Sequence, residues 1–170
     1  GMLKDGSWVK KQFRAYDVEI NVPKKYGGKK HFVTQATEYA KKIWMDMGFK
    51  EMTGNMVHTS FWNFDALFTA QDHPVREMQD TYFLGGTVEK GTLPSGELVQ
   101  KIRQVHERGG KTGSTGWGGT WDEEEAKRNV LRTHTTVLTA QTLAQLKGED
   151  LPAKFFALGK NFRNEAIDWK

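Results

Sequence analysis

Apolar residues recur at the spacing of one helical face between residues 36 and 47, and this pattern predicts the first helix of the chain. The apolar positions of that face are Ala36, Ala40, Ile43 and Met47. Thr34 is a suitable cap for its start and Gly48 for its end, because a hydroxyl accepts from free amides and glycine adopts positive φ. Residues 49–61 alternate loosely, which indicates extended chain interrupted at Gly54–Asn55, and residues 63–68 form a short helical patch.

Residues 85–120 are rich in glycine, so most of this stretch lacks a packed core of its own. One amphipathic helix is predicted within it, with Leu98, Ile102 and Val105 on one face. Ser95 would cap its start and Gly109–Gly110 would end it, and the residues up to 120 would form a flexible loop. We expect segment 85–120 to be a glycine-rich insertion on a domain surface.

The rest of the chain mixes helix and strand. Asp122, followed by Glu125, is typical of a capping box that begins another helix. Residues 131–135 are predicted to be extended, and a helix with Leu138, Leu143 and Leu146 is expected to end at Gly148. Pro152 then precedes a predicted strand over residues 154–165. The fold class is therefore α+β.

The predicted strand over residues 154–165 has two different faces, because successive side chains point to opposite sides. One face is apolar and suits a core: Phe156, Leu158 and Phe162. The other carries Ala157, Gly159, Asn161, Arg163 and Glu165. Small residues next to a guanidinium, which suits phosphate, and a carboxylate, which accepts from amino groups, indicate an open nucleotide site. An ordinary amphipathic strand with two solvated charges is the alternative that the periodicity leaves open.

Composition narrows the class of protein. With 170 residues, 37% hydrophobic and 12% aromatic, the chain has room for one domain and is too aromatic to be disordered. It has no apolar run near the ~18 residues of a membrane span and no secretory h-region at its start. It has no cysteine, which excludes disulfides, thiolate metal sites and a cysteine nucleophile. The cytosol is the expected compartment.

The net charge of +4 is unevenly distributed. Residues 1–30 are predicted to be a basic N-terminal arm with one short strand from Phe13 to Ile20, preceding a domain over residues 31–170. Lysine pairs in this arm could contact nucleic-acid phosphates, although a solvated lysine-rich surface is the simpler interpretation. These pairs are Lys10–Lys11, Lys24–Lys25 and Lys29–Lys30.

Several motifs resemble those of one enzyme family. Phe162-Arg163-Asn164-Glu165 resembles motif 2 of class II aminoacyl-tRNA synthetases, whose core is Phe-Arg-x-Glu. Three longer segments are similar to the catalytic α subunits of phenylalanyl-tRNA synthetases of the archaeal and eukaryotic type. They are SFWNFDALFTAQDHPVREMQDTYFL (60–84), LRTHTT (131–136) and PAKFFALGKNFRNEAID (152–168). Residues 48–52 resemble the motif 1 region, so the resemblance runs from about residue 31 to the end.

This resemblance implies a fold, a reaction and a set of partners. The fold would be a class II core, an antiparallel sheet flanked by helices, of which this chain holds the part through motif 2. The reaction would be ATP-dependent activation of phenylalanine followed by its transfer to tRNA(Phe), with Mg2+ sharing the charge of the phosphates. The β subunit of an α2β2 enzyme would be the protein partner. Motif 1 regions form subunit interfaces in this class, so a homodimer of the chain is also expected.

The resemblance also assigns roles to individual residues. Arg163 would be the catalytic residue that binds the α-phosphate of ATP, and Glu165 would orient the adenine. Thr136 and His134, two residues apart and pointing the same way if extended, would contact the ammonium or carboxylate of phenylalanine. Phe83 would add apolar surface to the amino-acid pocket. For His134, a purely structural hydrogen-bonding role is the alternative.

A charged cluster before residue 84 is not expected to be catalytic. Asp72, His73, Arg76 and Asp80 could form a proton relay or a metal site. However, the carboxylate of phenylalanine is itself the nucleophile of the activation step and needs no protein base. His73–Pro74 also indicates a turn. Arg76 and Asp80, four residues apart, are expected to form an ion pair.

Two further functions remain possible on the sequence alone. Motif 3, with its arginine for the γ-phosphate, lies beyond the part of the family that residues 31–170 resemble, so we expect this chain alone to form no adenylate. A non-catalytic, synthetase-like module that binds an amino acid, a nucleotide or a protein is the first alternative. A basic nucleic-acid-binding domain that uses residues 1–30 is the second.

Overall fold

The computed structural model describes residues 1, 3–12, 15–19, 21, 24–74, 76, 81–85 and 90–165. The chain divides into two compact units, residues 1–31 and 32–170. In the first unit the described residues form one regular element, the 3-10 helix η1 (Ser7–Lys10), and their side chains are exposed. Residues 15–19 form no strand, and Phe13 and Ile20, the ends of the expected strand, lie outside the described residues.

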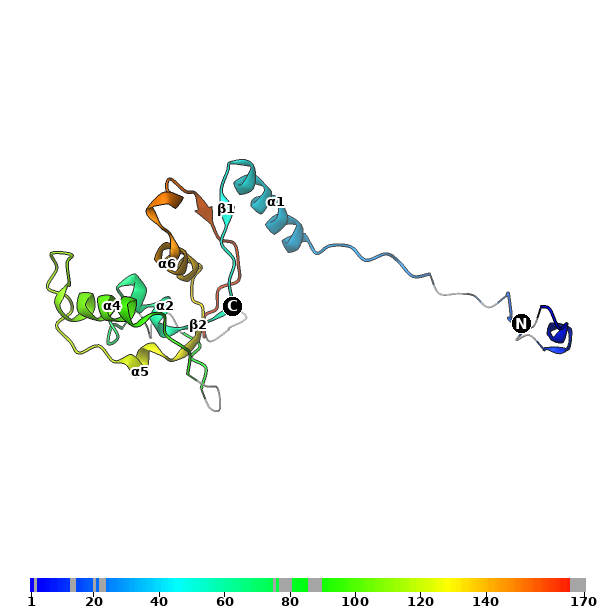
Figure 1. Ribbon diagram of the computed structural model, residues 1–170, viewed down its shortest axis with the longest axis horizontal. Helices are drawn as coiled ribbons and strands as arrows, with labels where there is room; N and C mark the ends of the chain where they lie inside the picture. Colours follow the sequence, from blue (N-terminus) through cyan, green and yellow to red (C-terminus); the bar gives the residue numbers. More distant parts are fainter. Residues whose placement is uncertain are drawn as a thin grey trace. The chain divides into compact units, whose positions relative to one another are not determined.

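The second unit combines short helices with short strands (Figure 1). Its described α-helices are α1 (Phe32–Asp46), α2 (Ser60–Asn63), α4 (Gly96–Arg108), α5 (Glu123–Ala126) and α6 (Thr136–Gln145). The strands are β1 (Lys50–Glu51), β2 (Val57–Thr59), β3 (Asn129–Leu131) and β4 (Phe155–Phe156), and the 3-10 helices are η2 (Asp65–Leu67) and η3 (Gly148–Asp150). The α+β class predicted from the sequence is confirmed.

The described strands form two small sheets rather than the single antiparallel sheet that we expected. β1 pairs with β4 in parallel, with Lys50 opposite Phe155, and β2 pairs with β3 antiparallel, with His58 opposite Val130. The predicted strand over residues 154–165 is wrong beyond Phe156, because the backbone that follows makes no ladder. Leu158, expected in the core, is consequently exposed.

The helix ends follow the capping chemistry only in part. Gly48 ends the first helix with a φ of 81°, as predicted, but α1 begins at Phe32, so Thr34 lies inside it and does not cap it. α4 lies between Ser95 and Gly109 as predicted, and Gly109 has a φ of 75°, but the Ser95 side chain makes no capping hydrogen bond. Asp122 caps α5 by accepting from the Glu124 amide. The expected capping box does not form, because the Asp122 amide donates to Gln71 and the Glu125 carboxylate binds Arg128.

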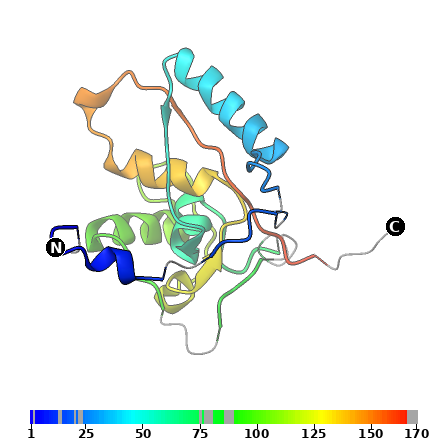
Figure 2. The ribbon, with the colours of Figure 1, turned by 90° about the vertical axis from the view of Figure 1, so that its right-hand side faces the viewer.

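The core lies around α2. Phe61 of α2 packs with Val99 of α4, Trp121 and Ala126 of α5. Figures 1 and 2 both show α2 among α4, α5 and α6, with the β2–β3 pair beside it. The helix of the glycine-rich segment 85–120 therefore contributes to the core and is not merely superficial. On the other side of the unit, Trp44 of α1 packs against the rings of Phe49 and Phe156, at centroid distances of 4.9 and 6.2 Å.

Candidate functional site

β3 is the scaffold on which the predicted site segments meet. On one edge it pairs with β2. On its other edge, the Leu131 amide donates to the Tyr82 carbonyl over 3.0 Å and the Leu84 amide donates to the Asn129 carbonyl over 2.8 Å. Phe83 is thereby bridged to Val130. The segments around residues 83 and 131, which both carry candidate residues, consequently lie side by side.

Arg132, directly after β3, holds three stretches of backbone together. Its amide donates to Met56 over 2.9 Å, and its carbonyl accepts from the Phe162 amide over 3.0 Å. The guanidinium Nε donates to the Lys160 carbonyl over 2.8 Å, and the whole residue is only 5% exposed. Its partners are carbonyls, and the described residues place no carboxylate on it. Arg132 therefore fixes the backbone that leads into residue 163.

Arg163 and Glu165, the candidate ATP-binding residues, lie in irregular backbone after this fixed stretch. Arg163 Nη1 donates to Glu165 Oε1 over 3.0 Å, and the two side chains are 65% and 54% exposed. The expectation that a strand face presents them over an open nucleotide site is wrong for this structure, since β4 ends at Phe156. An exposed pair of this kind contributes little stability, so both groups can exchange partners readily.

His134 and Thr136, the candidate amino-acid ligands, contact each other. The segment is not extended as predicted: β3 ends at Leu131 and Thr136 begins α6. The turn nevertheless places Thr136 Oγ1 in hydrogen-bond contact with His134 Nδ1. Burial lowers the pKa of His134, while a hydrogen bond to the Asn63 backbone opposes that shift. His134 is therefore neutral near pH 7 and can donate or accept a hydrogen bond.

Asn63 fixes this turn and was not identified from the sequence. It is fully buried on α2, and its amide nitrogen donates to Thr133 Oγ1 over 3.0 Å. Its amide oxygen accepts from the Thr133 backbone over 3.3 Å. These two bonds position the residue just before His134. The sequence signal for this role was an amide directly after the aromatic pair Phe61–Trp62, because an amide that is buried with such residues needs hydrogen-bond partners.

Phe83, the candidate apolar wall, is half-buried beside β3. The guanidinium of Arg128 lies 3.8 Å from its ring centroid, an attractive cation–π geometry. Glu125 binds the same guanidinium over 2.9 Å. The ring is thus held in place from the side of α5.

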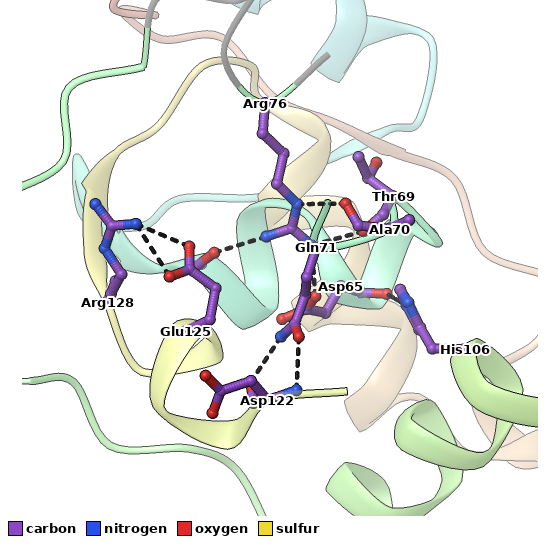
Figure 3. A network of polar contacts seen from close by, with 10 residues as sticks. Asp65, Thr69, Ala70, Gln71, Arg76, His106, Asp122, Glu125 and Arg128 are labelled. Carbon is purple, nitrogen blue, oxygen red and sulfur yellow. Dashed lines mark hydrogen bonds and ion pairs between the residues drawn. The ribbon is translucent and has the colours of Figure 1, made fainter. Parts of the chain in front are cut away.

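A buried ionic network underlies the site (Figure 3). Arg76 donates to the Asp65 carboxylate over 2.6 Å, to Ser60 Oγ over 2.9 Å and to the carbonyls of Thr69 and Ala70. His106 of α4 meets the Asp65 carbonyl over 2.8 Å. The expected partner Asp80 lies outside the described residues, and the partner that the structure places on Arg76 is Asp65.

Two buried polar atoms near this network, Asp65 Oδ2 and Trp121 Nε1, make no hydrogen bond of normal geometry among the described residues. Burial raises the pKa of the Asp65 carboxyl, and the charge of Arg76 and an interaction with the Trp121 side chain act in the opposite direction. Gln71 closes the other end of the network, with its amide bound at both ends to the Asp122 backbone over 2.6 and 2.7 Å. Asp65 and Arg76 thus bind each other inside the fold, and Arg76 also binds backbone carbonyls there.

Three cavities border these elements, and one of about 290 Å³ is lined in part by Asp65, Phe68 and His106. A polar cavity of about 390 Å³ lies along β2 and is lined only by uncharged groups, among them His58, Thr59 and Gln141. Burial lowers the pKa of His58, and the charge of Arg132 adds to that effect. A cavity of about 150 Å³ lies beside Trp117 and Trp121. None of the three is lined by Arg163 or Glu165.

The described residues contain neither a metal-binding cluster nor a membrane-spanning helix. Within the described ranges, no three His, Asp or Glu side chains are grouped so that they could hold a metal ion. None of the described helices has the length and apolar character needed to cross a bilayer.

Comparisons with known proteins cover almost the whole chain. The family model for the tRNA synthetases class II core domain (F) matches residues 15–170. The chain is 50% identical over 166 residues to the phenylalanine–tRNA ligase alpha subunit of Methanoculleus marisnigri, which covers 98% of this chain and 33% of that protein. It is 45% identical over 168 residues to the alpha subunit from Methanopyrus kandleri (99% and 32%) and 42% identical over 170 residues to that from Mus musculus (98% and 33%). The chain thus spans about a third of the length of the curated relatives it matches.

Proposed function

The chain belongs to the family of class II tRNA synthetase core domains, and we propose from this that it serves in the α subunit of a phenylalanine–tRNA ligase. The reaction would be activation of L-phenylalanine by ATP and transfer of the phenylalanyl group to tRNA(Phe). The partners would be the β subunit in an α2β2 enzyme and, through the motif 1 region, a second copy of this chain. The compartment would be the cytoplasm.

One observation supports the proposal most strongly: Arg132 joins the candidate ATP segment to the candidate amino-acid segment. Its carbonyl and Nε hold the backbone at Phe162 and Lys160, and it lies two residues before His134 in the chain. The backbone segments that carry the proposed ATP-binding and amino-acid-binding residues are therefore held next to each other by one buried residue. Orienting two reactants in this way is a major source of rate enhancement.

In the first step, the phenylalanine carboxylate attacks the α-phosphate and pyrophosphate leaves. Negative charge on the phosphoryl oxygens grows as the bond forms, so a guanidinium already in place stabilises the transition state. Arg163 is the group for this role. Its exposed ion pair with Glu165 is weak, so the Arg163 guanidinium can bind the α-phosphate instead. Glu165 would then be available to accept a hydrogen bond from the adenine amino group.

Thr136 and His134 would bind the polar end of phenylalanine. The Thr136 hydroxyl, exposed at the start of α6, can donate to the carboxylate or accept from the ammonium. His134, kept neutral by burial, adds no charge that would compete with the ammonium. Phe83, held by Arg128, would face the apolar ring. Mg2+ would accompany ATP and share the charge of its phosphates.

The test uses a hybrid α subunit, in which this chain replaces the matching third of the Methanoculleus marisnigri α subunit, assembled with that organism's β subunit. We expect isotope exchange between pyrophosphate and ATP that depends on L-phenylalanine and not on leucine or tyrosine. The unmodified M. marisnigri enzyme is the positive control. A folded hybrid complex that shows no phenylalanine-dependent exchange would refute the proposed function.

A further inference from the structure

The glycine-rich loop after α4 is folded tightly against the end of that helix. The Trp117 amide donates to the His106 carbonyl over 2.6 Å, and the Thr112 hydroxyl donates to the Gly109 carbonyl over 2.6 Å. Gly116 has a φ of 72°, and a Cβ there would lie 2.6 Å from the same His106 carbonyl. Glycine at this position therefore permits the close approach. The loop holds Trp117 in a set orientation.

Trp117 presents an open aromatic face at the tip of this arrangement. Its side chain is 50% exposed, and its ring centroid lies 5.4 Å from that of Phe68 and 6.0 Å from that of His73. Phe68 itself has a φ of 61°, an unusual conformation for a bulky residue. Such strain is concentrated at functional sites. Phe68, His73 and Trp117 thus form an aromatic cluster in which half of the Trp117 side chain stays exposed to solvent.

The loop that carries this ring is positively charged, whereas the cavity beneath the ring also has a carboxylate in its lining. Residues 108–119, called here the Trp117 loop, contain Arg108 and Lys111 and no acidic residue, and both cations are exposed. Beneath the ring, the cavity of about 150 Å³ is lined in part by Asp72 and Thr120. Their oxygens can accept from the amino groups of a flat ligand. The site combines a ring face, two cations and hydrogen-bond acceptors.

We propose that the Trp117 loop binds an unpaired nucleotide of tRNA, with the base stacked on Trp117 and the adjoining phosphates against Arg108 and Lys111. Proteins recognise unpaired RNA bases by stacking on exposed aromatic rings beside basic groups. The inference rests on the proposed function for the identity of the RNA, but not for the chemistry of the loop. It gives the glycine-rich segment a role in the second step of the reaction and none in the first.

The test separates the two steps in the hybrid α subunit, with an unmodified tRNA(Phe) transcript from M. marisnigri. Trp117→Ala is expected to raise the KM for tRNA and the Kd from filter binding about tenfold, equivalent to about 1.4 kcal/mol. Phenylalanine-dependent pyrophosphate exchange, which needs no tRNA, should stay within twofold. Trp117→Phe, which keeps a ring, should recover most of the affinity.

A second variant tests the phosphate contact. Lys111→Ala should reduce the slope of log affinity against log salt by about 0.7, as expected for one lost contact to a single strand. Lys101→Ala, which removes an exposed lysine of α4 paired with Glu97, is the matched control and should leave the slope unchanged.

Three outcomes would overturn the inference. One is a tRNA Kd for Trp117→Ala within twofold of the unmodified hybrid. Another is an equal loss of exchange and of tRNA binding, which would make Trp117 a structural residue only. The third is an unchanged slope in Lys111→Ala. Because filter binding needs no catalysis, absence of exchange in the unmodified hybrid would refute the proposed function alone.

Discussion

The guanidinium of Arg132 lies directly against the backbone of Gly159, where a Cβ would be 2.1 Å from Arg132 Nη2. The space beside residue 159 is thus filled by a buried arginine from another part of the chain, and not by a ligand above a strand.

Replacing this glycine should displace Arg132 from its carbonyl partners. Gly159→Ala is expected to lower the free energy of unfolding of the 170-residue chain by about 1–3 kcal/mol, the usual effect of overpacking. Urea denaturation measures it. Gly119→Ala is the control, because nothing lies within 4 Å of its Cβ position. Equal stability of the two variants would show that Arg132 does not occupy this place.

The buried pair of Asp65 and Arg76 should be essential for folding. Asp65→Ala leaves a buried guanidinium without its carboxylate, which typically costs about 3–5 kcal/mol. The double variant Asp65→Ala/Arg76→Met should lose less than the sum of the two single variants, because no charge remains buried. Denaturation of all three variants measures this coupling. Asp46→Ala, which breaks the exposed pair with Lys42, should cost less than about 1 kcal/mol. A cost for Asp65→Ala as small as that of Asp46→Ala would contradict the assignment.

Acid should weaken the fold through its neutral histidines. Burial holds the pKa of His58 and of His134 below the ordinary value of 6.5. Below pH 6.5 the unfolded chain takes up these protons while the folded chain does not, so the free energy of unfolding falls as the pH decreases. The stabilisation is fully present above pH 6.5 and is lost toward the lower, folded pKa values.

Unfolding measured in urea between pH 7.5 and 5 tests this dependence. His58→Gln should flatten the curve, and a substitution of His31, whose side chain is exposed, is the control. Imidazole NMR titrations of the folded chain that give His58 a pKa above 6.5 would contradict the explanation.

Thr136→Val in the hybrid α subunit should raise the KM for phenylalanine in pyrophosphate exchange by about tenfold, the scale of one lost hydrogen bond to a charged group. The KM for ATP should not change. Thr139→Val, a neighbouring threonine of α6, is the matched control. If both variants keep the phenylalanine KM of the unmodified hybrid, Thr136 only begins the helix.

The sequence predicts local features better than long-range ones. The end of α1 at Gly48 and the span of α4 between Ser95 and Gly109 follow from spacing and capping, which act within a few residues. The strand over residues 154–165 was overextended, because alternation indicates a face but not whether a partner strand lies alongside. Only Phe155–Phe156 finds one, in β1.

The candidate site shows the same limit. Arg163, Glu165, His134, Thr136 and Phe83 were chosen by resemblance to the family, and the roles assigned to them stay predictions. The residues that position them were missed because their partners are distant in sequence: Asn63 binds Thr133, and Arg76 binds Asp65, 11 residues before it. The spacing of residues within one helix or strand holds no information about contacts between segments that are far apart in the sequence.

Arg163, which follows the backbone that Arg132 fixes, should stabilise adenylate formation, and the rate of pyrophosphate exchange measures this role. Arg163→Ala in the hybrid α subunit should reduce phenylalanine-dependent pyrophosphate exchange by about a hundredfold or more, the usual loss of one donor to a developing oxyanion. Arg103→Ala, which removes a partly exposed arginine of α4, should stay within twofold of the unmodified hybrid. An exchange rate for Arg163→Ala within tenfold of the unmodified hybrid would show that Arg163 does not stabilise adenylate formation.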